Sequence, residues 1–584
     1  MPSKRATTTF PSNVALACIV TYRLYNALLI RTFFSPDEFW QSLEIAHERV
    51  FGSGYLTWEW THGVRGFAHP ALFAAVFWVL NAVGLGDDAH AEWLVVAPKL
   101  VQGIFAALCD IFTFLLARRL FGPVAAKWAL FASLVAFFNA FCAVRTFSNS
   151  IETSLTAVAM YYWPWPVQGA QIVLTRARLR DLNISLTFAA IACILRPTNA
   201  VIWIFLGVSL LRKLELRGVR GVLSRIALIG AVALGASTAL DTAFYQTPTF
   251  VPYTFFRFNL AQGIASFYGV HTWHWYLSQG LPVVLFTLLP FTAWTLLKRG
   301  GDVRGVSVAT VCLYSCVKHK EFRFVMPLLP VWLASAGEAL RVLEAWAEDA
   351  GSAAGKADHA SGGALRVTRS AKAAAESCKH GKSSVVGVRS YWRCVSFRAA
   401  LVGLVVTNFT AAFYLGVVHQ RGVLDVMTWL RKEDRGERGV LFMMPCHSTP
   451  FHSHLHKRDV EMRFITCEPP LDPAINKTTY QDESDVFYAD PLSFIDTYFL
   501  PIASTPQPGI RTRTDKLLPV PGQDSYLIQQ FLWPSRVVVF AALLERVGQN
   551  YFQDLLGYRE CARFFNSHFH DDSRRAGDVV VYCR

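Results

Sequence analysis

The stretch Phe33-Phe-Ser-Pro-Asp-Glu-Phe-Trp-Gln-Ser42 follows directly on the first apolar segment of the chain, at about 12–32. It places two adjacent carboxylates, Asp37 and Glu38, at the expected boundary of a membrane. Charged groups close to lipid are costly, so they usually mark a site of chemistry or transport. The alternative interpretation is local: acids after Pro36 also suit the first turn of a helix, where the helix dipole favours them.

The composition predicts an all-α polytopic membrane protein. Of the 584 residues, 53% are hydrophobic and 17% are charged, whereas a soluble globular chain carries about 25% charged residues. Aromatic residues reach 14%, which suits membrane interfaces. We expect about eleven transmembrane helices, because apolar runs of spanning or near-spanning length lie at about 12–32, 93–117, 124–142, 151–166, 183–196, 198–211, 222–242, 281–297, 305–317, 324–342 and 399–418.

The net charge of +14 does not indicate a nucleic-acid partner, because the basic residues fall in alternate connections between the apolar runs. The positive-inside rule places those connections in the cytosol. The opposite set, which includes 33–92 and everything after about 419, is then luminal. Pro70 to Leu85 is apolar as well, and we expect it to form a luminal juxtamembrane helix, because a span there would invert every later loop.

Four parts of the chain follow from this pattern. Residues 1–342 form a transmembrane catalytic module with the first luminal loop at 33–92. Residues 343–398 are rich in Ala, Gly, Ser, Lys and Arg and predict a flexible cytosolic insertion. The last transmembrane helix is expected at 399–418, and a mixed α/β luminal region at 419–584.

Two features of the C-terminal region agree with a luminal location. Asn476-Lys-Thr is a glycosylation sequon in a polar loop, whereas Asn183 and Asn408 match the same pattern inside predicted spans. An even number of cysteines suits a compartment that permits disulfides, and their pairing stays open among three possibilities. These cysteines are Cys446, Cys467, Cys561 and Cys583.

Carboxylates, cationic groups and aromatic rings gather in the predicted luminal loops. Carboxylates act as bases, cations hold phosphate groups, and aromatic rings pack on the faces of sugars. We therefore expect a site that handles a sugar and a phosphate together. The Trp-rich segments also fit an interfacial belt, and Lys318-His-Lys also fits the charged flank of a span.

Two further groups of polar residues have open interpretations. Arg23, Arg145 and Arg196 lie in or beside spans, where arginines either snorkel to the interface or line a polar cavity. His452, His454 and His456, with His447 nearby, resemble a metal cluster. No complementary set of Cys or acidic ligands accompanies these histidines, so we expect no metal site.

Several motifs together resemble glycosyltransferase family 22, multispan enzymes of the GT-C superfamily that use dolichyl-phosphate-mannose. The first is Phe34-Ser-Pro-Asp-Glu-Phe-Trp-Gln-Ser-Leu-Glu44, followed by Gly54-Tyr-Leu-Thr-Trp-Glu-Trp60. Arg145-Thr-Phe-Ser-Asn-Ser-Ile-Glu-Thr153 and His319-Lys-Glu-Phe-Arg-Phe324 resemble further family blocks. One position departs from the pattern, since several relatives have His where this chain has Ser35.

The resemblance implies inverting mannose transfer without a cofactor, on the luminal face of the endoplasmic reticulum membrane. Asp37 is the expected base for the acceptor mannose 2-hydroxyl, and Glu38 orients the acceptor or Asp37. His319, Lys320 and Arg323 are expected to hold the donor phosphate. The expected substrate-binding residues are Gln41, Trp58, Glu59, Trp60, Arg145, Asn149, Glu152, His271 and His274.

Within the family, the run from Phe267 to Tyr276 and Met444-Pro-Cys-His-Ser-Thr-Pro450 are most similar to one member. That member adds the third mannose, in α-1,2 linkage, to a glycosylphosphatidylinositol (GPI) precursor that carries two. Siblings that act on the lipid-linked N-glycan precursor, or that add a fourth GPI mannose, remain the alternative. A transporter is less favoured, because the chain has no clear internal repeat.

Overall fold

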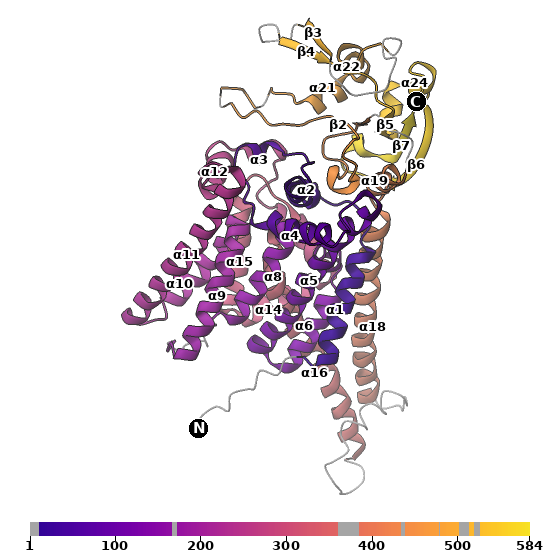
Figure 1. Ribbon diagram of the computed structural model, residues 1–584. Helices are drawn as coiled ribbons and strands as arrows, with labels where there is room; N and C mark the ends of the chain where they lie inside the picture. The colour runs from indigo at the N-terminus through magenta and orange to yellow at the C-terminus, as the bar shows by residue number, and fades with distance from the viewer. Residues whose placement is uncertain are drawn as a thin grey trace.

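A computed structural model of the protein describes residues 11–165, 172–359, 385–433, 439–472, 474–477, 479–501, 513–518 and 526–584. A helical bundle forms most of it, and a smaller α/β domain sits on one end (Figure 1). The bundle helices are α1 (Asn13–Leu29), α5 (Ala91–Phe121), α6 (Pro123–Val135), α8 (Ser148–Tyr162), α9 (Arg176–Leu195), α10 (Ala200–Leu211), α11 (Leu216–Tyr245), α14 (Leu289–Arg299), α15 (Gly301–Cys316), α16 (Leu329–His359) and α18 (Val385–Phe413). Each apolar run named above overlaps one of these helices.

The described helices support a multi-pass membrane protein. Five helical stretches are long and apolar enough to cross a membrane: Asp88–Phe121, Leu216–Tyr245, Tyr276–Arg299, Phe322–Glu348 and Val395–Lys432. Shorter apolar helices lie at Asn13–Leu29, Ala68–Ala82, Pro123–Val135 and Pro197–Leu211. Short elements join the bundle helices, namely α7 (Phe137–Cys142), α12 (Val251–Phe256), α13 (Leu281–Leu285) and the 3₁₀-helix η8 (Phe322–Leu328).

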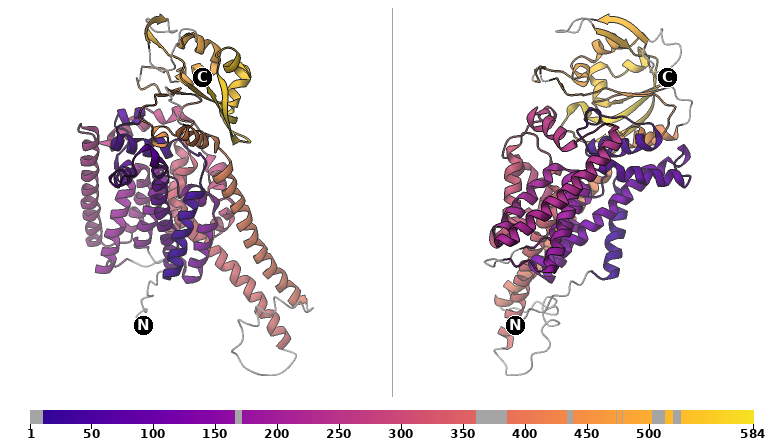
Figure 2. Two further views of the ribbon diagram at one scale, coloured as in Figure 1. Left: turned by 45° about the vertical axis from the view of Figure 1, so that its right-hand side comes forward. Right: turned by 60° about the vertical axis from the view of Figure 1, so that its left-hand side comes forward.

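Helices α16 and α18 extend beyond the rest of the bundle, at the end away from the α/β domain (Figure 2). Both helices reach into the predicted insertion at 343–398, since α16 continues to His359 and α18 begins at Val385. Part of the predicted insertion is therefore helical, and its centre at 360–384 lies outside the described residues. Ala, which is frequent in this segment, is also the best helix former.

The first luminal loop folds into four short helical elements at the opposite end of the bundle. They are η1 (Phe39–Leu43), α2 (Glu44–Phe51), α3 (Trp58–Thr61) and α4 (Ala68–Ala82). Helix α4 contains most of the apolar run Pro70–Leu85 and lies across the end of the bundle rather than along it (Figure 1). Its Phe73 and Phe77 are fully buried, and the Phe77 ring lies 6.0 Å from that of Phe51 on α2. This arrangement agrees with a juxtamembrane helix.

The C-terminal domain contains a mixed five-stranded sheet in the order β2-β1-β5-β7-β6. The strands are β1 (Val440–Met443), β2 (Met462–Phe464), β5 (Arg536–Phe540), β6 (Arg559–Ser567) and β7 (Gly577–Cys583). β1 runs parallel to β2 and β5, while β7 is antiparallel to β5 and β6. Every residue of β1 is buried, as expected for a central strand covered on both faces. The predicted mixed α/β character of this region is confirmed.

Helices and a second strand pair complete this domain. The helices are α19 (Gly422–Lys432), α20 (His452–Leu455), α21 (Glu483–Ala489), α22 (Pro491–Tyr498), α23 (Ala541–Val547) and α24 (Tyr551–Asp554). β3 (Arg513–Leu518) and β4 (Tyr526–Gln530) form the antiparallel pair. Of the three pairings that the sequence left open, the structure has Cys446 bonded to Cys467 and Cys561 to Cys583.

Direct hydrogen bonds attach the C-terminal domain to the first luminal loop. The Glu44 carboxylate accepts the backbone N–H groups of His452 at 3.1 Å and Ser453 at 2.9 Å. The Trp40 indole donates to the backbone oxygen of Thr449 at 2.9 Å. These bonds join residues more than 400 positions apart, so the loop that carries Asp37 and the C-terminal domain share one interface.

Candidate active site

The residues after Pro36 begin a helical turn, as the local interpretation of the two acids predicted. Phe39 and Trp40 both donate their backbone N–H to the Pro36 oxygen at 2.9 Å, and the turn continues into the π-helix η1. π-Helical turns are rare and occur often at functional sites. Because successive helical residues point about 100° apart, Asp37 and Glu38 face different surroundings.

Asp37 is a partly exposed carboxylate between two arginines. Arg323 Nη1 donates to Asp37 Oδ2 at 2.6 Å, and Arg65 Nη2 lies 3.8 Å from the same oxygen. The Asp37 side chain is 19% exposed. Burial raises the pKa of Asp37, but the positive charges of Arg323 and Arg65 outweigh burial and leave the pKa below its usual value. The group is therefore ionised at neutral pH and reachable from the surface.

The predicted donor-phosphate residues divide into two kinds. Arg323 also donates to Glu321, with Nε 2.5 Å from Oε2 and Nη2 2.7 Å from Oε1, and His319 Nε2 lies 3.2 Å from the same carboxylate. These groups form one cluster with Asp37. Lys320 differs, because it is buried and its ammonium donates to the backbone oxygens of His271, at 3.1 Å, and Val317. The prediction that Lys320 binds phosphate is thus not supported by its contacts.

The ionisation of this cluster follows from its ion pairs. Burial would raise the pKa of Glu321, but Arg323 and His319 lower it far below its usual range. Burial lowers the pKa of His319, and the bond to Glu321 more than compensates, so the pKa lies above its usual value. Cationic and anionic side chains therefore alternate beside Asp37.

Arg65 is held in place by a chain of predicted residues. It donates to Glu59 Oε1 from Nε at 3.0 Å and from Nη2 at 2.7 Å. Gln41 donates to the other Glu59 oxygen and accepts the Trp60 indole N–H at 2.7 Å. Trp60 is only 1% exposed and supports Gln41 through this bond, and its direct contact with a substrate stays a prediction.

Glu38 and Arg145 form a buried ion pair, with Arg145 Nη1 2.8 Å from Glu38 Oε2. The two side chains are 2% and 0% exposed. Arg145 also donates to the Thr32 backbone oxygen, the Thr32 hydroxyl and the Phe141 backbone oxygen. Glu38 was predicted to orient the acceptor or Asp37, and Arg145 to bind substrate, and both roles stay predictions. In the structure the pair joins the Pro36 turn to the connection between α7 and α8.

Asn149 and Glu152, on α8, lie directly behind the cluster. The Asn149 amide donates to the Arg323 backbone oxygen at 3.2 Å, and Arg196 Nε lies 3.5 Å from Glu152 Oε2. Asn149 and Glu152 are buried, whereas the Arg196 side chain is 13% exposed and its guanidinium lies 5.3 Å from the Phe324 ring. Of the two open interpretations of Arg196, the structure favours lining of a polar site.

The aromatic and histidine residues from the other predicted luminal loops border this site. The Trp58 indole donates to the Tyr268 hydroxyl at 2.6 Å and joins the first loop to the segment before α13. His271 is exposed and its ring stacks on Trp275 at 4.7 Å, while exposed His274 lies 3.2 Å from the Ser278 hydroxyl. Neither histidine forms a hydrogen bond with Asp37 or Arg323 among the described residues, so their contact with substrate stays a prediction.

An apolar cavity of about 340 Å³ lies between α9, α10 and α11. Apolar side chains such as Leu186, Ile194, Trp203, Ile226 and Ile229 line most of it. Its lining also includes Gly66 and Pro197, the residues that follow Arg65 and Arg196 in the chain. One end of this cavity therefore reaches the backbone next to Arg65 and Arg196.

The remaining candidates do not add a metal centre. Among the described residues, Cys446, His447 and Cys467 lie close enough to share an ion, but the two sulfurs are joined in a disulfide and are not thiolate ligands. Of the other histidines, His456 Nδ1 lies 2.7 Å from His47 Nε2 at the domain interface. Asn476 is exposed, and its glycosylation stays a prediction, because Thr478 of the sequon lies outside the described residues.

The model of the Alg9-like mannosyltransferase family, Glyco_transf_22, matches residues 14–456, which include all the residues around Asp37 described above. The chain belongs to this family. The predicted family and the predicted enzyme class, a membrane glycosyltransferase, are both confirmed.

Full-length relatives in this family carry consistent names. The chain is 37% identical to GPI mannosyltransferase 3 of Yarrowia lipolytica over 97% of this chain and 96% of that protein. It is 36% identical to GPI alpha-1,2-mannosyltransferase 3 of Mus musculus over 97% of this chain and 88% of that protein. The predicted similarity to the GPI-assembly member of the family is therefore confirmed.

One solved structure shares the fold. ArnT from Cupriavidus metallidurans, solved with undecaprenyl phosphate bound, matches with a TM-score of 0.53 at 13% identity, over 97% of each chain. At this identity the likeness concerns the fold alone. It supports the predicted fold class, a bundle of apolar helices with a smaller mixed α/β region.

Three residues of this mannosyltransferase site were missed by sequence reasoning. Arg65 follows Glu59 by six positions in the same loop, and Glu321 lies inside a motif that was recognised for its cations. His69, at the start of α4, is buried, and its Nε2 has no hydrogen-bond partner among the described residues. Only the fold reveals that Arg65 and Arg323, 258 positions apart, meet at one carboxylate.

Proposed function

We propose that this mannosyltransferase uses dolichyl-phosphate-mannose and adds mannose in α-1,2 linkage to a GPI precursor that carries two mannoses. The reaction takes place on the luminal face of the endoplasmic reticulum membrane. The names of the full-length relatives support the GPI pathway and the linkage. The two disulfides of the domain beside the site support the luminal side, because disulfides persist in oxidising compartments.

One observation carries the proposed chemistry: an ionised, partly exposed carboxylate lies between two guanidinium groups next to an apolar cavity. Asp37 accepts the proton of the acceptor 2-hydroxyl while that oxygen attacks the anomeric carbon of mannose. The bond from this carbon to the phosphate oxygen breaks on the opposite face, and dolichyl phosphate leaves. A single displacement of this kind inverts a β-linked donor to an α-linked product and needs no covalent enzyme intermediate.

Arg323 and Arg65 connect donor binding to the strength of the base. In the structure both guanidinium groups are directed at Asp37, and they stabilise its charge. A donor phosphate between them would form charge-assisted hydrogen bonds with the same groups and draw them partly away from Asp37. The carboxylate would then become a better proton acceptor when the donor is in place. As the leaving phosphate gains charge in the transition state, preorganised cations stabilise it by several kcal/mol.

The apolar cavity between α9, α10 and α11 suits the first isoprene units of the donor. Its polar end next to Arg65 and Arg196 would place the phosphate, while the chain continues towards lipid along α11, whose apolar surface is largely exposed. Partly exposed cationic groups at one end and aliphatic lining along the rest match an amphipathic lipid phosphate.

Lipid analysis of cells that lack the protein tests the proposed function. We expect a GPI precursor with two mannoses to accumulate, and wild-type protein, but not Asp37→Asn, to restore its extension. A truncated N-glycan precursor, or a GPI precursor with three mannoses, would instead assign the enzyme to one of its siblings. In vitro transfer from dolichyl-phosphate-mannose, with a dolichyl-phosphate-glucose control, tests the donor separately.

A further inference from the structure

The loops that follow β1 and β2 meet beside the first luminal loop, where the Trp40 ring lies 4.5 Å from that of His447. β1 and β2 are parallel neighbours, so both strands end at the same edge of the sheet. The Cys446–Cys467 disulfide joins the two loops three residues beyond the end of each strand. Ligands of sheets with parallel strands commonly bind at this carboxyl edge. Here that edge faces the catalytic loop instead of open solvent.

His447 stands in an unusual backbone conformation within this joined pair of loops. Its φ of 55° lies in the left-handed region, which costs a non-glycine residue about 1–3 kcal/mol and persists where the surroundings enforce it. The imidazole lies 4.5 Å from the Trp40 ring, centre to centre, and its Nδ1 lies 3.7 Å from Cys467 Sγ. Outliers of this kind cluster at ligand clamps and active sites.

The electrostatic surroundings connect His447 to the base. Burial and, to a lesser extent, the charge of Arg575 lower the pKa of His447 to about 4, although the charge of Asp37 opposes them. The imidazole is therefore neutral at physiological pH and is close enough to Asp37 to respond to its charge. A neutral imidazole offers one donor and one acceptor, which suits a sugar hydroxyl.

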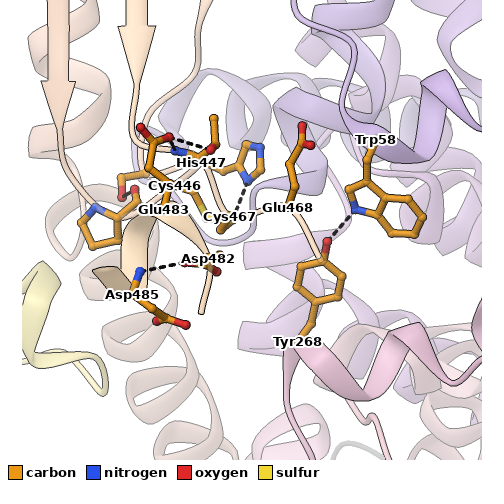
Figure 3. The surroundings of a disulfide bond; sticks show 12 residues. Trp58, Tyr268, Cys446, His447, Cys467, Glu468, Asp482, Glu483 and Asp485 are labelled. Carbon is orange, nitrogen blue, oxygen red and sulfur yellow. Dashed lines mark hydrogen bonds between the residues drawn. A yellow bond between two sulfur atoms is a disulfide. The ribbon is translucent and has the colours of Figure 1, made fainter. Parts of the chain in front are cut away.

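Glu468, the residue after Cys467, provides a carboxylate next to the disulfide. Figure 3 shows Glu468 between the disulfide and the Trp58–Tyr268 pair. Glu468 is exposed, and the Tyr55 hydroxyl lies 3.5 Å from its Oε1. The Tyr480 hydroxyl holds the Glu468 backbone oxygen at 3.1 Å, and the Tyr480 ring lies 6.0 Å from that of Phe267. Tyr480 thus joins the segment after Cys467 to the loop that carries Phe267 and Tyr268.

From this geometry, and resting on the proposed mannosyl transfer, we propose that the disulfide-joined loops hold the acceptor glycan against Asp37. His447 and Glu468 form hydrogen bonds with its hydroxyl groups, while the exposed Tyr268 ring packs on a sugar face. A carboxylate, an imidazole and aromatic rings are the groups that recognise a neutral oligosaccharide. These contacts select the acceptor on which Asp37 acts, so the C-terminal domain determines acceptor specificity.

The test uses the full-length enzyme in lipid vesicles, with dolichyl-phosphate-mannose and a synthetic two-mannose GPI glycolipid. We compare Glu468→Gln and His447→Asn with the wild type and with Asp554→Asn. Asn tolerates the left-handed region, so His447→Asn keeps the backbone conformation while it removes the imidazole. Asp554 is an exposed carboxylate on α24, on the outer side of the same domain (Figure 1), and serves as the control.

We expect Glu468→Gln and His447→Asn each to raise the KM for the acceptor by about 10-fold. This is the loss of affinity expected when one hydrogen bond to a charged or buried polar group is removed. The KM for the donor and the slow hydrolysis of the donor without acceptor should stay at wild-type values, as should the melting temperature. An unchanged acceptor KM in Glu468→Gln would overturn the inference. The Glu468 side chain is exposed, so this substitution should not disturb folding. A wild-type enzyme that does not extend the two-mannose acceptor would overturn the proposed function instead.

Discussion

Asp37 and Glu38 are neighbours in the chain, yet they occupy opposite kinds of environment. Asp37 is 19% exposed and shares Arg323 with another carboxylate, whereas Glu38 is 2% exposed and pairs with an arginine that is fully buried. The first arrangement leaves an ionised oxygen within reach of a substrate. The second satisfies both partners internally, because Arg145 directs its remaining donors to backbone and hydroxyl oxygens.

The difference shows that two neighbouring acids on one helical turn can have different roles. One is placed to react with substrate, and the other stabilises the turn through a buried ion pair. A buried ion pair contributes little net stability, but breaking it leaves an uncompensated charge in a dry environment. An exposed carboxylate costs little to keep and can change partners. The predictions below test this division by removing one member at a time.

The largest effect is expected for Asp37→Asn. Loss of a general base lowers the turnover number by about 10²–10⁴-fold, and Arg323 keeps its bonds to Glu321 in the variant. The measurement is mannose transfer by the purified enzyme, with the melting temperature as a check on folding. A folded variant with wild-type turnover would remove Asp37 from the role of base.

Glu38→Gln is expected to act on stability rather than directly on catalysis. The Arg145 charge would remain buried without a counter-charge, which costs about 3–5 kcal/mol. Denaturant unfolding in detergent measures the change. Adding Arg145→Met should recover part of the loss, because replacing a buried pair by apolar groups is often neutral. A stable Glu38→Gln enzyme with only a raised acceptor KM would show that Glu38 meets substrate after all.

Much of this architecture could be predicted from the sequence because membrane spans obey simple rules. Backbone groups in lipid must be satisfied within a helix, so each apolar run in the chain overlapped a helix of the bundle. Helices α16 and α18 also extend beyond their apolar stretches, to His359 and from Val385. Outside lipid, hydropathy no longer restricts where a helix ends.

The candidate site was predicted in its residue types but not in its contacts. Asp37, Arg323 and His319 were identified from motifs, and the structure brings them together. Their partners could not be predicted, because a sequence does not tell which arginine meets which carboxylate: Arg145 was expected at the substrate and is buried. The contacts of Lys320 could not be predicted either. It lies between His319 and Glu321 in the chain, but its ammonium donates to backbone oxygens instead of joining their ion pairs.

Arg65→Gln tests whether one of the two arginines beside Asp37 binds the donor phosphate. If Arg65 binds the donor phosphate, its loss removes a charge-assisted hydrogen bond, and kcat/KM for the donor should fall by about 10–100-fold. Arg65→Lys should lie between the two, because lysine keeps the charge but loses the paired bonds to Glu59. Initial rates at varied donor concentration provide the measurement. A donor kcat/KM equal to that of the wild type would restrict the phosphate site to the other arginines.

The smallest effect concerns Glu44, a third acid of the same loop, which is buried without a cation. Burial raises the pKa of Glu44 to about 7, although the N–H groups of Ser453, His452 and Tyr55 oppose the shift. In the unfolded chain this group loses its proton near its usual pKa of about 4.3, so between that pH and 7 the folded state binds more protons. Stability contributed by this group therefore falls as pH rises through this window and is highest below it.

Glu44→Gln removes this titration and should flatten the pH dependence of the melting temperature between about pH 4.3 and 7. One amide oxygen replaces two carboxylate oxygens as acceptor for three N–H groups, so we also expect a modest, pH-independent loss of stability, about 1 kcal/mol. Thermal unfolding at a series of pH values separates the slope from the offset. If the variant keeps the slope of the wild type, another group at the domain interface titrates in this range, and buried His47 and His456 are the next residues to replace.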